Sequence, residues 1–493
     1  MDEHTGDRLS RRRVGQALVG GTLIIGLDAL TRAFGVSTDT ANSSSGASLP
    51  KLDGQLLTDS ATLNAFAQDY GQIVHEQPLV VLRPGSVRDI QRMVRFARRY
   101  GIRVVARGQG HQPFGQAQVQ GGIAIDMSSL QSVRSVRADA IDVDAGAQWR
   151  SVLTNALPYG VAPPVLTSYL GLTVGGTLSI GGIGVGTFRN GAQIDNVLAL
   201  DVVTGEGDLV TCSASRHRDL FEAVLAGQGQ CGVITRAVLR ADGVQPQVRE
   251  YVLPYSDLGS LLQAGERLRD ERRFDGVVAI ITPSPQGWTY LMTAVRQFTP
   301  PAIPNDADLL KDLGYVAGSE QIRTADFLEY ADAMPNIDYA QSHADLGLHL
   351  PQSTAHTFIG DMLPRLIAQD LGGAMVIRLF FLRANVFGQP LFRVPGESSF
   401  TYMALIRSET SDADALTRML AGNRALYEQC REQGGTLYPF AAVAMTRGDW
   451  ERHYGEHLQA LRKAKHRYDP ANVFSSGPDE LFPFGQFDVN ASP

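Results

Sequence analysis

The sequence is poor in the features that mark several classes of protein. It has only 3 cysteines in 493 residues, namely Cys212, Cys231 and Cys430. That is too few for a disulfide scaffold, no zinc spacing is present, and whether two of them pair stays open. Acidic residues outnumber basic ones, 51 to 44, for a net charge of −7, which argues against nucleic acid as the main partner. No stable membrane span is expected, because the N-terminal apolar run is short.

What is present is the composition of an ordinary globular protein. The hydrophobic share is 44%, which is enough for a substantial core. At about 150 residues per domain, the length predicts roughly two to four units.

The N-terminus, residues 1–48, reads as a segment outside the fold. Arg11, Arg12 and Arg13 precede a short apolar stretch from Val14 to Leu27, which is the pattern of an export signal. Adjacent arginines favour the twin-arginine route, and hence an exported or secreted protein. A basic arm leading into a short helix, or a retained anchor, also fits the pattern. Residues 37–48 are rich in Ser, Thr, Ala and Asn and are typical of a flexible linker.

The most informative segment is a glycine turn that carries one histidine. A strand expected over residues 103–106 leads into Gly108 and Gly110, and His111 follows directly. Glycines let backbone N–H groups approach a pyrophosphate closely. An imidazole held in such a turn can also serve as a covalent tether. This segment therefore predicts a ligand site.

A second glycine-rich region runs from Tyr169 to Arg189. So many glycines predict neither strand nor helix interior. They suit backbone wrapped around a flat or phosphorylated ligand, although a mobile lid or a tightly turned loop is an equal alternative for this region alone. The presence of a second glycine loop in addition to the first favours the ligand-binding interpretation.

A third glycine pattern is discounted. Gly227, Gly229 and Gly232 match G-x-G-x-x-G, but the dinucleotide fingerprint needs a strand before it and a helix after it. Here a helix is expected at residues 219–225 and a strand at 233–239. The order is reversed, so the segment predicts a tight helix-to-strand turn.

Periodicity predicts an α+β or α/β unit in the first half of the chain. Ile90, Met93, Val94 and Ala97 repeat at helical spacing, with Gly101 as the stop. Another helix is expected at residues 148–157, and strands are expected at 79–83, 122–125, 140–143 and 197–203.

The middle of the chain predicts an antiparallel sheet with helices on one face. Strands are expected at residues 250–254, 276–281, 288–295, 376–382 and 400–406, and helices at 412–431 and from a cap at Ser256 to Leu268. Aromatic residues that could border a pocket, although core packing fits each one better, are Trp288, Phe380, Phe381 and Tyr402. His343, His349 and His356 lie near Asp345; their irregular spacing favours solvated loop residues over a metal site, and no metal is expected. A basic helix after Asp449 should end near Tyr468, before Pro470.

Several segments resemble the cytokinin dehydrogenase branch of the vanillyl-alcohol-oxidase-like, PCMH-type flavoproteins. They are the His111 loop, residues 172–179, 193–205 and 225–236, and the terminal run 468–470. The resemblance implies a two-domain fold in which a split FAD-binding domain is closed by the C-terminal segment around an inserted substrate domain. The implied boundaries are 49–245 for the FAD-binding domain, 246–435 for the substrate domain and 436–493 for the returning segment.

The resemblance also implies residue roles. His111 would bond covalently to FAD. Residues expected to line the pyrophosphate and ring, or the rest of FAD, are Ala106, Arg107, Gly108, Gln109, Gly110, Gln112, Gln116, Thr173, Gly176, Ser179, Ile183, Ile234 and Ser475. No cysteine stands near Gly171, so a single covalent link is expected.

Departures from the family limit the predicted activity. A family aspartate that accepts a proton from the substrate amine is Ser168 here, a family glutamate aligns with Val278, and a tail glutamine is Pro478. A hydroxyl is a far weaker base than a carboxylate, so cytokinin cleavage is in doubt. Ser168 and Tyr169 are the candidate catalytic residues.

The sequence thus predicts an FAD-linked oxidase or dehydrogenase. It would oxidise a C–H bond beside nitrogen or oxygen of a small organic substrate, with hydride passing to flavin N5 and electrons then passing to oxygen or another acceptor. Three alternatives stay open: a cytokinin dehydrogenase with a relocated base, an oxidase of sugars, alcohols or secondary metabolites, and a flavin carrier without catalysis.

Overall fold

The structure is a computed structural model that describes residues 49–474, apart from 334–338, 367–371, 373 and 410–411. The predicted export signal and linker, residues 1–48, lie outside the described residues, as do Ser475 and Pro478. Among the described residues, no helix is long and apolar enough to cross a membrane. All three cysteines are buried and free.

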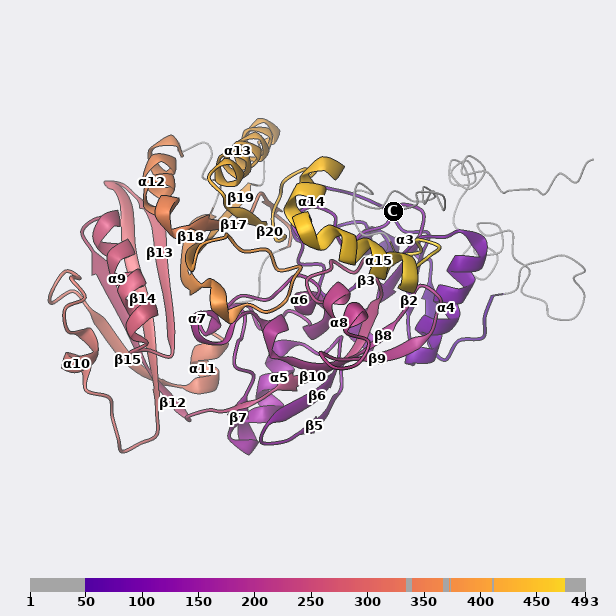
Figure 1. Cartoon of the computed structure of the whole chain (residues 1–493), viewed down its shortest axis with the longest axis horizontal. Coiled ribbons are helices and arrows are strands. Elements are labelled where there is room, and N and C mark those ends of the chain that lie inside the picture. Colours follow the sequence, from indigo (N-terminus) through magenta and orange to yellow (C-terminus); the bar gives the residue numbers. More distant parts are fainter. Residues whose placement is uncertain (1–48, 334–338, 367–371, 373, 410–411, 475–493) are drawn as a thin grey trace, which may run out of the picture.

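The protein mixes helices and sheets (Figure 1), as the sequence predicted. The first sheet has the order β1-β2-β4-β3, with β2, β4 and β3 parallel and β1 antiparallel to β2. Its strands are β1 (Gln55–Leu57), β2 (Val80–Arg83), β3 (Val104–Arg107) and β4 (Ile123–Asp126). Helix α4 (Val87–Tyr100) connects β2 to β3 and buries the predicted apolar face. It ends at Gly101 with φ 61°, a left-handed conformation that glycine adopts freely.

The second sheet is antiparallel and has the order β5-β6-β10-β8-β9. Its strands are β5 (Val133–Val136), β6 (Ala140–Asp144), β8 (Val197–Val203), β9 (Leu209–Cys212) and β10 (Val233–Arg240). The helices α5 (Trp149–Ala156), α6 (Val174–Leu178) and α8 (Arg218–Val224) contact this sheet, whereas α3 (Ser60–Phe66) packs on β2 of the first sheet. The same half of the chain contains α7 (Thr187–Asn190) and the short pair β7 (Val161–Ala162) and β11 (Asp242–Gly243). The two sheets share one apolar core.

The third sheet is larger and fully antiparallel. Its order is β15-β12-β14-β13-β18-β19-β17-β20, and β16 pairs with β19. The strands are β12 (Gln247–Tyr255), β13 (Gly276–Ser284), β14 (Gly287–Phe298), β15 (Gln321–Asp326), β16 (Ser342–His343), β17 (Leu346–Pro351), β18 (Ala374–Arg383), β19 (Ser399–Glu409) and β20 (Thr436–Tyr438). Its helices are α9 (Leu258–Glu271), α10 (Asp306–Leu310), α11 (Phe327–Ala331), α12 (Gln352–Met362) and α13 (Ala413–Glu432).

Alternation along the central strands gives this sheet two different faces. In β18, Ile377 and Leu379 enter the core beneath α9, α12 and α13, whereas Phe380 belongs to the core shared with the first two sheets. Successive side chains of a strand point to opposite faces, so one strand serves two environments. This confirms the predicted sheet with helices on one face.

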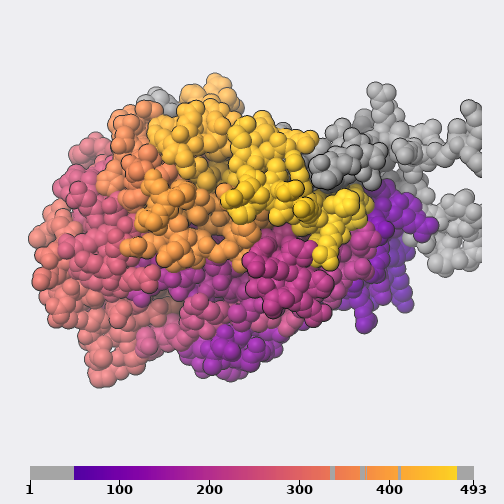
Figure 2. Space-filling model, in the orientation of Figure 1, coloured from indigo at the N-terminus to yellow at the C-terminus, as the bar shows by residue number. Residues whose placement is uncertain are grey.

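The C-terminal segment returns to the first half of the chain, and its yellow surface adjoins both the orange and the magenta parts in Figure 2. Helices α14 (Arg447–Tyr454) and α15 (Leu458–Tyr468) form this segment, and α15 packs on α8 of the first half. The Lys465 ammonium, fully buried, donates to the Asp469 carboxylate (2.7 Å) and to the carbonyls of Gln230 and Phe474. These bonds fix the tail against the first half of the chain.

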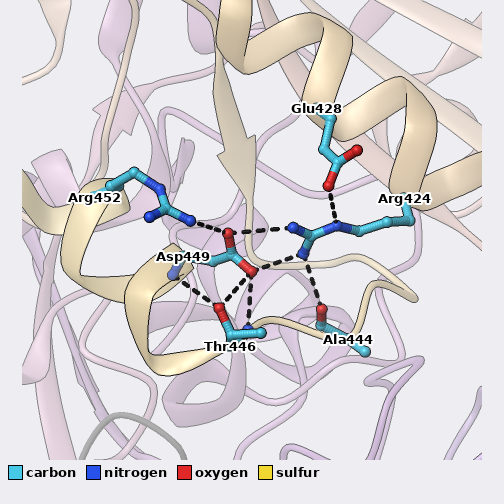
Figure 3. Close-up of polar contacts among 6 residues, drawn as sticks. All are labelled: Arg424, Glu428, Ala444, Thr446, Asp449 and Arg452. Atoms are coloured by element: carbon cyan, nitrogen blue, oxygen red, sulfur yellow. Dashed lines mark hydrogen bonds and ion pairs between the residues drawn. The ribbon is translucent and has the colours of Figure 1, made fainter.

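A second buried carboxylate joins α13 to α14 (Figure 3). Asp449 has no exposed side-chain area and accepts hydrogen bonds from Arg424, Arg452 and Thr446. Burial opposes its ionisation, but the hydrogen bonds from the two guanidiniums and from Thr446 outweigh it and hold the pKa of Asp449 well below the ordinary range. Asp449 also forms the capping box that begins α14.

The structure corrects four local predictions. The N-cap of α9 is Asp257, whose carboxylate accepts from the Ser260 amide; Ser256 bonds to that carboxylate instead. The second glycine region contains two short helices, α6 and α7, because glycines such as Gly175 and Gly176 adopt the helical backbone conformation here. The basic helix is interrupted at Gly455, which gives α14 and α15. Residues 436–438 form β20, paired with β17, so the sheet extends past the predicted boundary at 435.

Candidate active site

A cavity of about 520 Å³ lies between the glycine loops of the first half and the face of the large sheet. One wall comes from the His111 loop, the second glycine region and the turn after α8, and the other comes from β18, β19 and the segment around Asp345 and Tyr438. Predicted site residues that line it are Ala106, Gly108, Gln109, Gly110, His111, Gln112, Gln116, Ser168, Tyr169, Thr173, Gly176, Ser179, Ile183 and Ile234.

The His111 loop is held in place by the segment after α3. The amide of Tyr70 donates to the Gly110 carbonyl (2.8 Å) and that of Gly71 to the Gln112 carbonyl (3.2 Å). The Asp69 carboxylate accepts from the amides of Gly71 and Gly115. The loop is therefore fixed by carbonyls and by a carboxylate, which leaves N–H groups free to face the cavity.

These free groups suit a phosphate-bearing cofactor. Among the described residues, the structure shows no acceptor for the N–H groups of Gln109, Gly110 and His111. The buried Oε1 atom of Gln112, which also lines the cavity, has no hydrogen-bond partner. Buried polar groups in proteins are normally paired. Unpaired groups in a glycine cradle fit the pyrophosphate and polar ring edge of FAD.

The other two glycine segments reach the same cavity. Gly108 packs so closely on Thr173 that an added Cβ would stand 2.0 Å from the Thr173 hydroxyl, which joins the first two loops. The discounted third pattern is a helix-to-strand turn between α8 and β10, as predicted. Its Gln228 amide donates to the Ser179 carbonyl, and Gly229 lines the cavity. Sequence reasoning identified the turn but not its place at the site.

His111 is surrounded by aromatic rings. Its ring centroid lies 4.2 Å from that of Tyr70, 5.4 Å from that of Phe440 and 5.7 Å from that of Tyr169, and its Nδ1 contacts the Tyr339 hydroxyl at 3.0 Å. Burial, reinforced by His343, lowers the pKa of His111 to about 3. The imidazole is therefore neutral at physiological pH and keeps the nitrogen lone pair that a covalent bond requires.

The opposite wall is polar as well as aromatic. Arg378 and Phe380 of β18 and Tyr402 of β19 line the cavity, and the rings of Phe380 and Tyr402 stack at 5.6 Å. Asp345, just before β17, is 1% exposed and accepts a hydrogen bond from the Tyr70 hydroxyl at 2.9 Å. Among the described lining residues, Asp345 is the only carboxylate and Arg378 the only guanidinium.

Arg107 lies outside the cavity, and Phe381 and Trp288 have the core-packing role that the sequence favoured. Arg107 does not line the cavity, because its guanidinium lies over the Phe66 ring and donates to the Phe66 carbonyl. Phe381 and Trp288 belong to the helix-backed core, so only two of the four proposed aromatics border the pocket.

The histidine prediction is also corrected. His343 and His349 are buried rather than solvated, on β16 and β17, and His343 lines the cavity. His356 contacts Glu266 from α12. Within the described part of the chain, no three His, Cys, Asp or Glu side chains are placed to hold a metal ion.

Known families match both walls of this cavity. A family model described as an FAD binding domain matches residues 78–213, and one described as the FAD and cytokinin binding part of cytokinin dehydrogenase 1 matches residues 309–482. The first covers the His111 and second glycine loops, and the second covers Asp345, Arg378 and Tyr402. The class defined by fold and site is therefore an FAD-binding oxidoreductase.

Similar proteins narrow this class. An uncharacterized oxidoreductase, ORF5 of the fasciation locus of Rhodococcoides fascians, is 36% identical over 85% of this chain and 97% of its own length. Cytokinin dehydrogenase 1 of Oryza sativa subsp. japonica is 31% identical over 86% and 91%, and cytokinin dehydrogenase 2 of Arabidopsis thaliana is 29% identical over 87% and 94%. The chain belongs to the cytokinin dehydrogenase family, and it is an FAD-linked oxidase or dehydrogenase.

Proposed function

We propose that this enzyme oxidises a C–H bond next to nitrogen or oxygen of a small organic substrate, with FAD tethered to His111. The observation that carries the proposal is the single cavity in which His111 and the glycine loops face the polar sheet wall. FAD, when bound, accepts a hydride from the substrate carbon and passes its electrons to oxygen or another acceptor.

The side chains of this cavity supply binding and orientation. The N–H groups of Gln109 and Gly110 would hold the cofactor's phosphates, and Gln112 would meet its polar edge. Stacked Phe380 and Tyr402 offer a flat apolar surface for a planar substrate. Ser168 and Tyr169 line the cavity near His111 and remain the proposed substrate contacts.

Covalent attachment is supported by the neutral, half-buried imidazole of His111. Acid precipitation of the purified protein should give a yellow pellet, because a covalently held flavin survives unfolding. The His111→Ala variant should release its flavin to the supernatant, whereas His356→Ala, a matched histidine away from the cavity, should keep it in the pellet. A yellow His111→Ala pellet would place the bond elsewhere.

A second candidate function is oxidation of N6-substituted adenine cytokinins. It is favoured by the family model described as FAD and cytokinin binding, whose match includes the sheet wall of the cavity, and by the names of the relatives. Anaerobic addition of isopentenyladenine separates the two candidates. Bleaching of the flavin absorbance would support cytokinin oxidation, whereas bleaching only by other amines or by alcohols would support the broader function.

We also propose a split domain organisation and export. The division of the chain into a core shared by the first two sheets and a helix-backed core of the large sheet supports two domains, with α15 returning to the first. Export rests on the arginine pattern of residues 11–13, and replacing Arg12 and Arg13 by lysine should retain the protein in the cytoplasm.

A further inference from the structure

The proposed oxidation releases a proton that some side chain must accept. When hydride leaves a carbon, the adjacent N–H or O–H loses its proton as the C=N or C=O bond forms. Asp345 is the only carboxylate among the described residues that line the cavity. A carboxylate is the strongest candidate base there, since His111 is assigned to the cofactor.

Asp345 is hydrogen-bonded to Tyr70, which also lines the cavity. The Tyr70 hydroxyl donates to Asp345 Oδ2 at 2.9 Å, across 275 residues of sequence. The Tyr70 ring lies 4.2 Å from the His111 ring and stacks on the His343 ring at 3.9 Å. The Tyr70 ring therefore lies beside the point where the flavin would be tethered, and its hydroxyl bonds to Asp345.

We propose that the Tyr70 hydroxyl accepts the substrate's proton and passes its own to Asp345 Oδ2, so that Tyr70 is a catalytic residue and Asp345 its positioning and proton-storing partner. This rests on the proposed function. In the step, the substrate's N–H or O–H bond breaks and a bond to Tyr70 Oη forms. The former Tyr70 proton bonds to Asp345, and the hydride with its electron pair goes to FAD. Asp345 loses the proton to water after product leaves.

The surroundings of Asp345 keep it ready to change charge. Burial raises the pKa of Asp345 to about 7, while the amide of Arg407, the Tyr70 hydroxyl and the guanidiniums of Arg407 and Arg378 act in the opposite direction. The titratable and charged groups that face it are Tyr70, His343, Arg378 on β18, and Tyr402 and Arg407 on β19. A base whose pKa lies near the working pH is well matched to proton transfer.

Burial also raises the pKa of Tyr70, but it moves this group away from the working pH. Desolvation and the neighbouring Asp345 charge raise the pKa of Tyr70 far above its ordinary value. A phenol that cannot ionise alone must give up its proton as it accepts one. The two groups therefore work as a pair, and removing either hydroxyl or carboxylate should have a similar effect.

The test is the rate of anaerobic flavin reduction at about pH 5.5 to 9, measured by stopped flow with the fastest substrate of a panel of amines, alcohols and isopentenyladenine. Only ionised Asp345 accepts a proton, so the wild-type rate should rise with pH through an inflection near 7 and then level off. Asp345→Asn and Tyr70→Phe should lower the plateau about 10²- to 10⁴-fold and remove the inflection. Asp345→Glu should restore part of the rate and the inflection.

The matched control is Asp195→Asn. Burial raises the pKa of Asp195 to about 6, but this carboxylate accepts from the Ala192 and Gly388 amides and does not line the cavity. Its removal should leave the inflection unchanged. Difference infrared spectra between low and high pH give a readout independent of turnover. A protonated-carboxyl band that titrates near pH 7 should be missing in Asp345→Asn.

The test distinguishes a failure of this inference from a failure of the proposed function. If wild-type flavin is reduced and Asp345→Asn keeps the inflection, or Tyr70→Phe reacts within about twofold of wild type, the pair is not the proton acceptor and the proposed function stands. If no substrate of the panel reduces the wild-type flavin, the proposed function fails and the inference with it. Should Asp345→Asn not fold, Tyr70→Phe, which removes one oxygen atom, decides the question.

Discussion

Asp449 and Asp345 are both buried carboxylates, yet their surroundings shift their pKa values in opposite directions. Asp449, at the joint between α13 and α14, is bonded by two guanidiniums and a threonine. Asp345, in the cavity wall, is bonded by one amide and one phenol. The pKa of Asp449 is held below its ordinary range, and that of Asp345 is raised to about 7.

Both side chains are almost inaccessible to solvent, but Asp449 has two guanidinium partners, whereas Asp345 lies deeper in the fold and its desolvation is the dominant effect. A buried carboxylate with direct cationic partners stays ionised and holds structure together, whereas one without them can exchange a proton near neutral pH. The C-terminal segment therefore uses buried charge for attachment, and the cavity uses it for chemistry. Groups that change charge at working pH are typical of functional sites.

The largest expected effect comes from the most buried pair. Lys465→Met should lower the free energy of unfolding by about 3–5 kcal/mol, because Asp469 would be left buried without its cation. Lys463→Met, an exposed lysine on the same helix, should change it by no more than about 0.5 kcal/mol. Denaturant unfolding followed by circular dichroism measures both. Equal effects would mean that the buried pair contributes nothing to the attachment of the tail.

The two central carboxylates should differ when each becomes an amide. Asp449→Asn should destabilise the protein by about 2–3 kcal/mol, since two arginines lose their partner and α14 loses its capping box. Asp345→Asn should change stability by less than about 1 kcal/mol at neutral pH, because the carboxylate it replaces is only partly ionised there. Thermal unfolding of both variants at one pH measures the two losses of stability. A larger loss in Asp345→Asn than in Asp449→Asn would contradict this prediction.

The pH dependence of stability should separate them further. The folded-state pKa of Asp449 is depressed, so its contribution is present above the unfolded value near 4 and is lost as the pH falls. The folded-state pKa of Asp345 is raised, so wild type should lose stability relative to Asp345→Asn as the pH rises from about 4 to 7. Unfolding curves of the three proteins from about pH 2 to 7 provide the check. Parallel curves would show that neither carboxylate is perturbed.

The smallest expected effect concerns Arg378. Its guanidinium lies in the cavity wall, and its Nε has no hydrogen-bond partner among the residues that the structure describes. Arg378→Met should raise the pKa of Asp345 and move the kinetic inflection upward by less than about one pH unit. Arg383→Met, on the same strand but paired with Asp270 at the surface, should leave it in place. A downward movement in Arg378→Met would contradict the proposed electrostatics.

Local patterns in the sequence predicted one wall of the site. Gly108, Gly110 and His111 stand within four residues, and the repeat in α4 and the order of elements around Gly227 are equally local. These features depend on neighbours in the chain, so spacing alone reveals them. The antiparallel sheet and its helix-covered face were also visible, because strand alternation is a local property.

The other wall could not be predicted in the same way. Tyr70 and Asp345 come together only through the tertiary fold, and neither has a motif around it. Arg378 could have been recognised from the sequence, because a lone arginine inside the apolar strand from Ala374 to Leu382 must be buried or face a cavity. Arg107 lies outside the cavity because it follows Ala106 on one strand, and adjacent positions on a strand point to opposite faces.

The return of the tail also has a consequence for the order of synthesis. Tyr438 and Phe440 complete the cavity wall, and Phe474 bridges to Val104 beside the His111 loop. A nascent chain halted before these residues leave the ribosome has an open cradle and an incomplete core. Secure enclosure of a cofactor therefore awaits the translation of residues 438–474, so we expect ribosome-bound chains halted before them to retain flavin poorly.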